Sequence, residues 1–178
     1  RQGLMTAYVA LLRAVNVGGT GTLPMARLAE LCTGLGLGNV RTYIQSGNVV
    51  FSSPWSADAA RTALEMALTD ELGTPAQVII RTAAELERAV SANPFPDAEG
   101  AKVGVMLAQE PVPAAIVDGV CAPGGEQVVP GERELYVYYP GGMGRSKLTL
   151  PKSLGPVTVR NMNTMTKLVA LTRDIPAG

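Results

Sequence analysis

Short apolar runs and amphipathic stretches alternate along the first half of the chain. The apolar, β-rich runs predict strands at residues 7–15, 40–45, 48–52 and 76–81. Between them, apolar residues recur every three or four positions in two stretches. The first begins behind Thr22 and Pro24 and stops at Gly36, and the second begins at Ser56 and stops at Gly73, so each predicts a helix. The predicted order of elements is βαββαβ.

The second half gives the same order. Apolar runs predict strands at residues 103–108, 126–129, 134–139 and 157–160, and helices are predicted at 113–120 and 146–154. No similarity between individual residues of the two halves is evident, so the repeat is inferred from the order of elements alone. This order is typical of ferredoxin-like folds.

Two further helices are predicted outside the repeated units. Thr82 and Glu85 have the spacing of a capping box and begin a connecting helix that stops at Asn93 and Pro94. A last helix begins at Asn163 and ends before residue 176.

The sequence therefore predicts an α+β protein with two ferredoxin-like (alpha-beta plait) units, each with an antiparallel sheet, and a C-terminal helix. The first unit is expected at 5–81, a connecting helix and linker at 82–100, and the second unit with the C-terminal helix at 101–174. Residues 1–4 are excluded because Met5 is the expected native start.

Charge is segregated along a chain whose formal net charge is zero. Residues 1–57 carry a net charge of +3, residues 58–134 of −8 and residues 135–178 of +5. Between Leu135 and Arg173 there is no carboxylate at all. Such segregation favours an anionic partner. Nucleic acid is a weaker candidate than a small anion, because aromatic residues, which stack on bases, make up only 4% of the chain.

Three polar blocks carry hydrogen-bond donors and no carboxylate: residues 13–19, 42–48 and 158–167. Together with the basic loop at 141–147 they supply the candidate ligand-binding residues, which are Arg13, Asn16, Gly18, Gly19, Ser46, Asn48, Lys147, Arg160, Asn161, Asn163, Thr164 and Lys167. Guanidinium, amide, hydroxyl and ammonium groups and glycine-loop N–H groups suit a phosphate or a carboxylate.

Each block also has a purely structural interpretation. Residues 16–22 form a loop that needs positive φ angles, and Ser46, Gly47 and Asn48 form a hairpin turn. Asn161 or Asn163 serves as a helix N-cap. The glycine loop matches neither the dinucleotide nor the P-loop fingerprint.

The amino-acid composition excludes most catalytic chemistry that depends on histidine. The chain has no histidine, which excludes Ser-His-Asp and Cys-His chemistry. Its two cysteines are far apart in sequence, so no metal site and no cofactor are predicted. A secretory pattern and a long apolar run are also lacking in the printed sequence, so a cytoplasmic location without a membrane partner is expected.

The chain resembles the bacterial family called domain of unknown function 1697. The resemblance rests on the motifs YVALLR at 8–13, NVGG at 16–19, TYIQSGNVVF at 42–51, NPF at 93–95, SKL at 146–148, RNMNT at 160–164 and KL at 167–168. It implies a fold of two alpha-beta plaits and carries no activity with it.

The function expected from the sequence is binding of a small anionic or phosphorylated ligand between the two halves. Two alternatives stay open: a histidine-free enzyme that acts on such a ligand, and a structural or interaction domain whose free sheet edges pair with a copy or a partner. The sequence predicts no oligomeric state.

Overall fold

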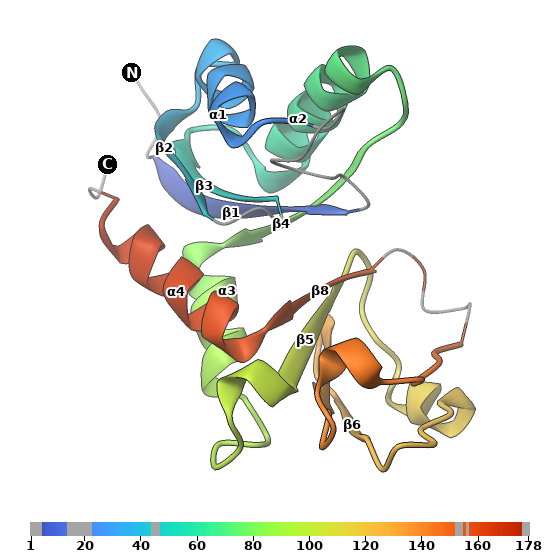
Figure 1. Cartoon of the computed structure of the whole chain (residues 1–178). Coiled ribbons are helices and arrows are strands. Elements are labelled where there is room, and N and C mark those ends of the chain that lie inside the picture. Colours follow the sequence, from blue (N-terminus) through green and yellow to red (C-terminus); the bar gives the residue numbers. More distant parts are fainter. Residues whose placement is uncertain (1–4, 14–22, 44–46, 152–154, 156, 176–178) are drawn as a thin grey trace. The chain divides into compact units, whose positions relative to one another are not determined.

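The structure, a computed structural model, describes residues 5–13, 23–43, 47–151, 155 and 157–175 (Figure 1). The chain divides into two compact units, Arg1–Leu86 together with Leu168–Gly178, and Glu87–Lys167. We call them unit 1 and unit 2. Each contains one four-stranded antiparallel sheet, so the predicted α+β fold of two ferredoxin-like units with a C-terminal helix is confirmed.

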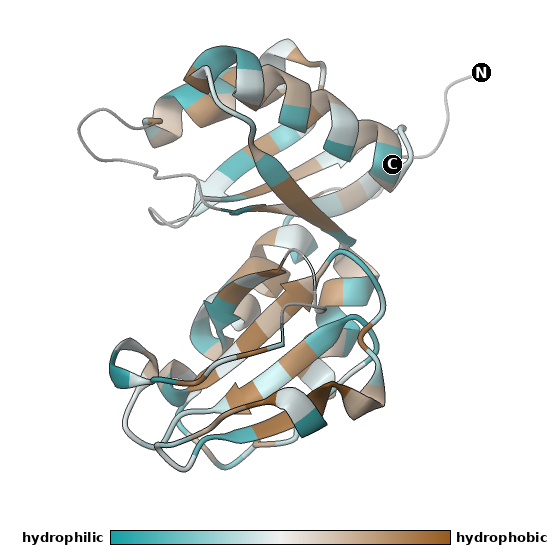
Figure 2. Ribbon diagram, turned by 90° about the vertical axis from the view of Figure 1, so that its right-hand side faces the viewer, coloured by the Kyte–Doolittle hydropathy of each residue, from teal (hydrophilic) through white to brown (hydrophobic). Residues whose placement is uncertain are grey.

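Unit 1 has the predicted order of elements: β1 Thr6–Arg13, α1 Met25–Gly34, β2 Gly38–Tyr43, β3 Asn48–Ser53, α2 Ala57–Leu72 and β4 Gln77–Thr82. The sheet order is β2-β3-β1-β4, in which each neighbouring pair is antiparallel. One sheet face packs against α1 and α2 around Leu28, Phe51 and Leu64, which are fully buried. Figure 2 shows hydrophobic positions along the strands and mixed positions along the helices.

The termini of α2 follow the sequence signals. The Ser56 hydroxyl accepts a hydrogen bond from the N–H of Ala59, and Gly73 ends the helix with a φ of 74°. This left-handed conformation favours glycine. The predicted stripe of Ala60, Leu64 and Leu68 is buried, which holds α2 on the sheet.

The second half contains α3 Ala83–Ser91, β5 Val103–Ala108, β6 Gln127–Pro130, β7 Glu134–Tyr138, β8 Val157–Asn161 and α4 Met162–Arg173. Helix α3 begins at the predicted capping box, in which Thr82 and Glu85 exchange hydrogen bonds. The sheet order is β6-β7-β5-β8, which is the order of unit 1 repeated. None of the described helices combines the length and apolar character needed to cross a bilayer.

Of the two helices predicted inside the repeat of unit 2, one is present as a short 3-10 helix, η2 Ala114–Gly119, and the other is wrong. After η3 Met143–Arg145, the described part of the predicted helix at 146–154 is not helical. Here Leu148 and Leu150, two residues apart, both pack on the core of unit 2, and Thr149 bridges to Cys121. A spacing of two is strand-like.

The halves do share individual residues at their fourth strands, contrary to the sequence analysis. In β4, Arg81 stands opposite Val9, the fourth residue of β1. In β8, Arg160 stands opposite Val105, the third residue of β5. The residue after each arginine caps the following helix, Thr82 for α3 and Asn161 for α4. The repeat therefore extends to matched side chains at the junction of strand and helix.

Candidate functional site

Arg160 is the most deeply buried of the predicted ligand-binding cations that the structure describes. It lies one residue before the end of β8 and is only 7% exposed. Its Nη1 donates to the hydroxyl of Thr158 at 2.7 Å and to the carbonyl of Val159 at 2.9 Å. Burial lowers the pKa of this guanidinium to about 10, because the charged form loses its hydration. A cation held in this way is stabilised by any anion that approaches it.

Asn161 and Thr164 connect the strand to helix α4. The Asn161 side-chain oxygen accepts a hydrogen bond from the Thr164 N–H at 2.8 Å, so Asn161 is the N-cap, one of the two caps considered from the sequence. Helix α4 therefore begins at Met162, one residue before the predicted start. Thr164 is buried in the first turn. The helix dipole places partial positive charge at this end.

Asn163 and Lys167 are exposed, whereas Arg160 and Thr164 are buried. Asn163 is exposed overall, but its side-chain oxygen occupies the space that a Cβ on Gly100 would fill. Gly100 begins the 3-10 helix η1 Gly100–Lys102. Asn163 thus packs on backbone within unit 2. Lys167 is exposed on α4.

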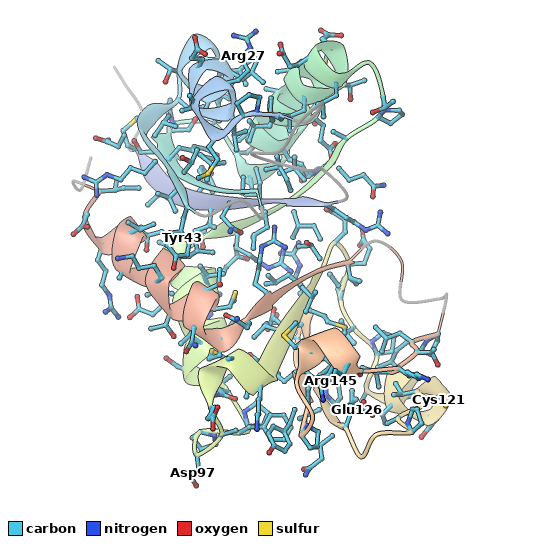
Figure 3. All side chains as sticks on the ribbon, in the orientation of Figure 1. Arg27, Tyr43, Asp97, Cys121, Glu126 and Arg145 are labelled. Atoms are coloured by element: carbon cyan, nitrogen blue, oxygen red, sulfur yellow. The ribbon has the colours of Figure 1, made fainter. Side chains whose placement is uncertain are left out.

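Lys147 lies in a loop in which the neighbouring Ser146 side chain makes two hydrogen bonds. The Ser146 hydroxyl donates to a carboxylate oxygen of Glu126 at 2.8 Å, and the same hydroxyl oxygen accepts from the Leu148 N–H. The hydrogen bond from Ser146 is the main cause that holds the pKa of Glu126 below its usual value. Lys147 is exposed. Figure 3 shows Glu126 and Arg145 in this region of unit 2.

Two predicted residues lie in unit 1, at one end of its sheet. Arg13 ends β1 and donates to the side-chain oxygen of Gln77 at 2.6 Å. Asn48 begins β3, is fully buried and donates to the carbonyl of Tyr43, a residue labelled in Figure 3. Gly47, the residue before Asn48, takes the left-handed conformation with a φ of 78°, which favours glycine.

Five of the predicted residues lie near one another in the sequence, along one segment of unit 2: Arg160, Asn161, Asn163, Thr164 and Lys167. We call residues 160–167 the β8–α4 segment. Asn16, Gly18, Gly19 and Ser46 lie outside the described residues. The meeting of Arg13 and Asn48 with the β8–α4 segment at one site stays a prediction.

Sequence analysis missed Arg81, the counterpart of Arg160. It is 2% exposed, and its Nη1 donates to the carbonyl of Ile80 at 3.1 Å. The signal was present in the sequence, since each arginine directly precedes a capping residue and follows a β-branched run. The two positions do not match in the sequence because Thr82 and Asn161 are different residue types with the same capping role.

Other parts of the described chain offer weaker sites. A hollow of about 310 Å³ in unit 1 is lined by Thr62, Glu65, Met66, Thr69, Asp70 and Ala76, and it contains no predicted site residue. Among the residues that the structure describes, no three His, Cys, Asp or Glu side chains are grouped as a metal site would require.

The two four-stranded sheets and their order of elements define a protein with two ferredoxin-like units. Residues 5–136 match the family model described as "Protein of unknown function (DUF1697)", and the chain belongs to this family. The solved structure of the conserved bacterial protein SP0830 from Streptococcus pneumoniae is similar, with a TM-score of 0.74, 22% sequence identity and coverage of 94% of this chain and 99% of that one. This likeness shows the fold. No curated protein matches the chain.

Proposed function

We propose that the β8–α4 segment of unit 2 binds a small anion, a phosphate or a carboxylate group of a larger ligand. The observation that carries the proposal is the burial of Arg160, which in the sequence directly precedes Asn161, the N-cap of α4. In the sequence around it, no carboxylate occurs between Leu135 and Arg173. Anions are stabilised both by such a cation and by a helix N-terminus.

The energetics favour an anionic ligand. Burial of a charge is costly, and the depressed pKa of Arg160 reflects that cost. An anion beside Arg160 would restore part of the lost solvation. The amide nitrogen of Asn161 and the ammonium group of Lys167 lie along the same segment and would contribute further donors. Lys147, on its own loop, completes the set of donors that we propose for unit 2.

Asn161→Asp separates ligand binding from structural support. Aspartate is as good an N-cap as asparagine, so the melting temperature should stay unchanged or rise. The new carboxylate would repel an anion, and the substitution also removes the amide donor. Hydrogen bonds to charged groups contribute about 1.5–3 kcal/mol. Calorimetric titration with inorganic phosphate should therefore show affinity weakened about tenfold or more. Thr82→Asp, at the matching cap of α3, is the control and should leave phosphate binding unchanged.

A second candidate function is a structural joint within unit 2. The hydrogen bonds described above for Arg160 and Asn161, and the packing of Asn163, all involve this unit itself. Under this alternative, wild-type protein shows no saturable heat with phosphate, and Arg160→Met lowers the melting temperature. Methionine keeps most of the side-chain volume, so the comparison reports the polar contacts rather than a cavity.

A further inference from the structure

The hollow in unit 1 follows one face of α2. Five of its lining residues recur along this helix at the spacing that places side chains on one face, and the sixth directly precedes β4: Thr62, Glu65, Met66, Thr69, Asp70 and Ala76. We call it the α2 hollow. Its volume of about 310 Å³ falls at the lower end of the range for small-molecule pockets, about 300–1,000 Å³.

Two side chains that line the α2 hollow are held by hydrogen bonds to the backbone at the start of β4. A carboxylate oxygen of Glu65 accepts from the Val78 N–H at 2.9 Å, and the Thr69 hydroxyl accepts from the Ala76 N–H at 3.3 Å. The Nη1 of Arg61 donates to the other carboxylate oxygen of Glu65 at 3.1 Å. Because these contacts already order Glu65 and Thr69, a ligand would not have to do so.

The two charged residues that line the α2 hollow, Glu65 and Asp70, are both acidic. Asp70 is exposed and forms no ion pair with the described residues, whereas the next residue, Glu71, pairs with Arg27 at 2.8 Å. The lining therefore attracts a cation. Within the described ranges no three His, Cys, Asp or Glu side chains are grouped, so an organic cation fits better than a metal ion, which needs several such ligands.

An apolar side chain borders these carboxylates. Met66 is 64% exposed, the highest exposed fraction of any large hydrophobic residue in the described part of the chain. Its flexible thioether can adapt to a molecule that lies against it, and covering it would remove apolar surface from water. The methyl group of Ala76 lines the same hollow. The lining therefore matches a molecule that combines a cationic group with a short carbon chain.

We propose that the α2 hollow binds a small aliphatic amine. Its ammonium group, which is protonated at neutral pH, donates hydrogen bonds to the carboxylates of Asp70 and Glu65, since a carboxylate can accept several. Its carbon chain covers Met66. This site lies in unit 1 and takes a cation, whereas the β8–α4 segment lies in unit 2 and takes an anion, so the two proposals stand or fall separately.

Titration of isotope-labelled wild-type protein with butylamine, at neutral pH and constant ionic strength, tests the site through backbone amide chemical shifts. Saturable shifts are expected at residues 62–76, with residues 158–167 unaffected. Two further probes separate the contributions of charge and chain. The probe 1-butanol has the same chain without the charge, and methylamine has the charge with a shorter chain. Each should bind about fivefold more weakly than butylamine, or weaker still.

Three variants locate the bound amine. Asp70→Asn keeps the shape of the side chain and removes its charge, so the affinity for butylamine should fall about fivefold. Glu71→Gln is the matched control and should bind as the wild type does, because Glu71 pairs with Arg27 and does not line the hollow. Met66→Lys places an ammonium group of the chain itself four residues before Asp70 and should abolish the shifts.

Three results would overturn amine binding at the α2 hollow. The first is a set of shifts that never saturate with butylamine. The second is equal affinity of the wild type for butylamine and 1-butanol, a comparison that needs no variant to fold. The third is wild-type affinity for butylamine in a folded Asp70→Asn protein.

Discussion

Arg81 and Arg160 hold the same position in two different sheets. Each lies in the fourth strand of its unit, donates from Nη1 to the carbonyl of the residue before it, and precedes the capping residue of a helix. Burial of a guanidinium costs free energy of folding. Because a buried arginine occurs at the same place in both units, we infer a shared structural requirement at this junction. The matched caps make that requirement testable.

Removal of either cap should destabilise the helix that it begins. Asn161→Ala and Thr82→Ala each remove the acceptor of a first-turn N–H, which costs about 1 kcal/mol of stability. Urea unfolding of the two variants measures this loss, with Asn161→Ser as a control that retains a capping oxygen. Equal stability of Asn161→Ala and wild type would show that the hydrogen bond from Thr164 contributes nothing.

Gly100→Ala should reveal the packing of Asn163. A Cβ at position 100 would meet the Asn163 side-chain oxygen and, at 2.8 Å, its Cγ. The extra methyl group should cost about 1–3 kcal/mol, as overpacking does. In an Asn163→Ala background the same change should cost clearly less, because the clashing atoms are gone. Additive costs in this double-mutant cycle would contradict the contact.

Gly104→Ala tests a close approach inside unit 2. A Cβ at this position of β5 would lie 2.8 Å from a ring carbon of Tyr139 and 3.3 Å from a methyl carbon of Val159. Tyr139 is buried, so its ring has little room to move, and thermal unfolding should show a loss of about 1–3 kcal/mol. Gly141→Ala is the control, because nothing lies within 4 Å of a Cβ there. Equal stability of the two variants would contradict this packing.

The fold was predictable where local signals and tertiary packing agree. The Ser56 cap, the Leu64 and Leu68 stripe and Gly73 all specify α2, and the structure has each of them in that role. The helix predicted over residues 146–154 is wrong in its described part, because Leu148 and Leu150 pack on the core two residues apart, which is not a helical spacing. Such a short segment takes its conformation from the core that it covers, and the local sequence does not reveal that core.

The candidate site was predictable in its residues but not in their burial. Arg160 and Asn161 were recognisable as polar donors between a strand and a helix. Their sequence does not show that Arg160 is buried or that its Nη1 donates to its own strand. Burial of an edge-strand side chain depends on which elements cover that face of the sheet, and that is a property of the tertiary structure. The burial of Arg81 depends on the tertiary structure in the same way.

Alkaline pH should destabilise the protein through Cys32. This thiol is fully buried on α1, and burial raises its pKa from 9.0 to about 12. Above pH 9 the unfolded chain loses this proton while the folded chain keeps it, so stability falls as pH rises. The loss between pH 8 and pH 10 should be about 1.4 kcal/mol. Urea unfolding at several pH values measures it, and Cys32→Ala should remove this component. A Cys32→Ala protein with the wild-type slope would contradict the assignment.

Titration of isotope-labelled protein with inorganic phosphate, followed by backbone amide chemical shifts, tests the proposed binding function most directly. We predict saturable shifts centred on residues 158–167 in the wild type, weakened by salt because the attraction is partly electrostatic. The same shifts should be lost in Asn161→Asp and retained in Thr82→Asp. Shifts that never saturate, or shifts of equal size in wild type and Asn161→Asp, would contradict anion binding at the β8–α4 segment.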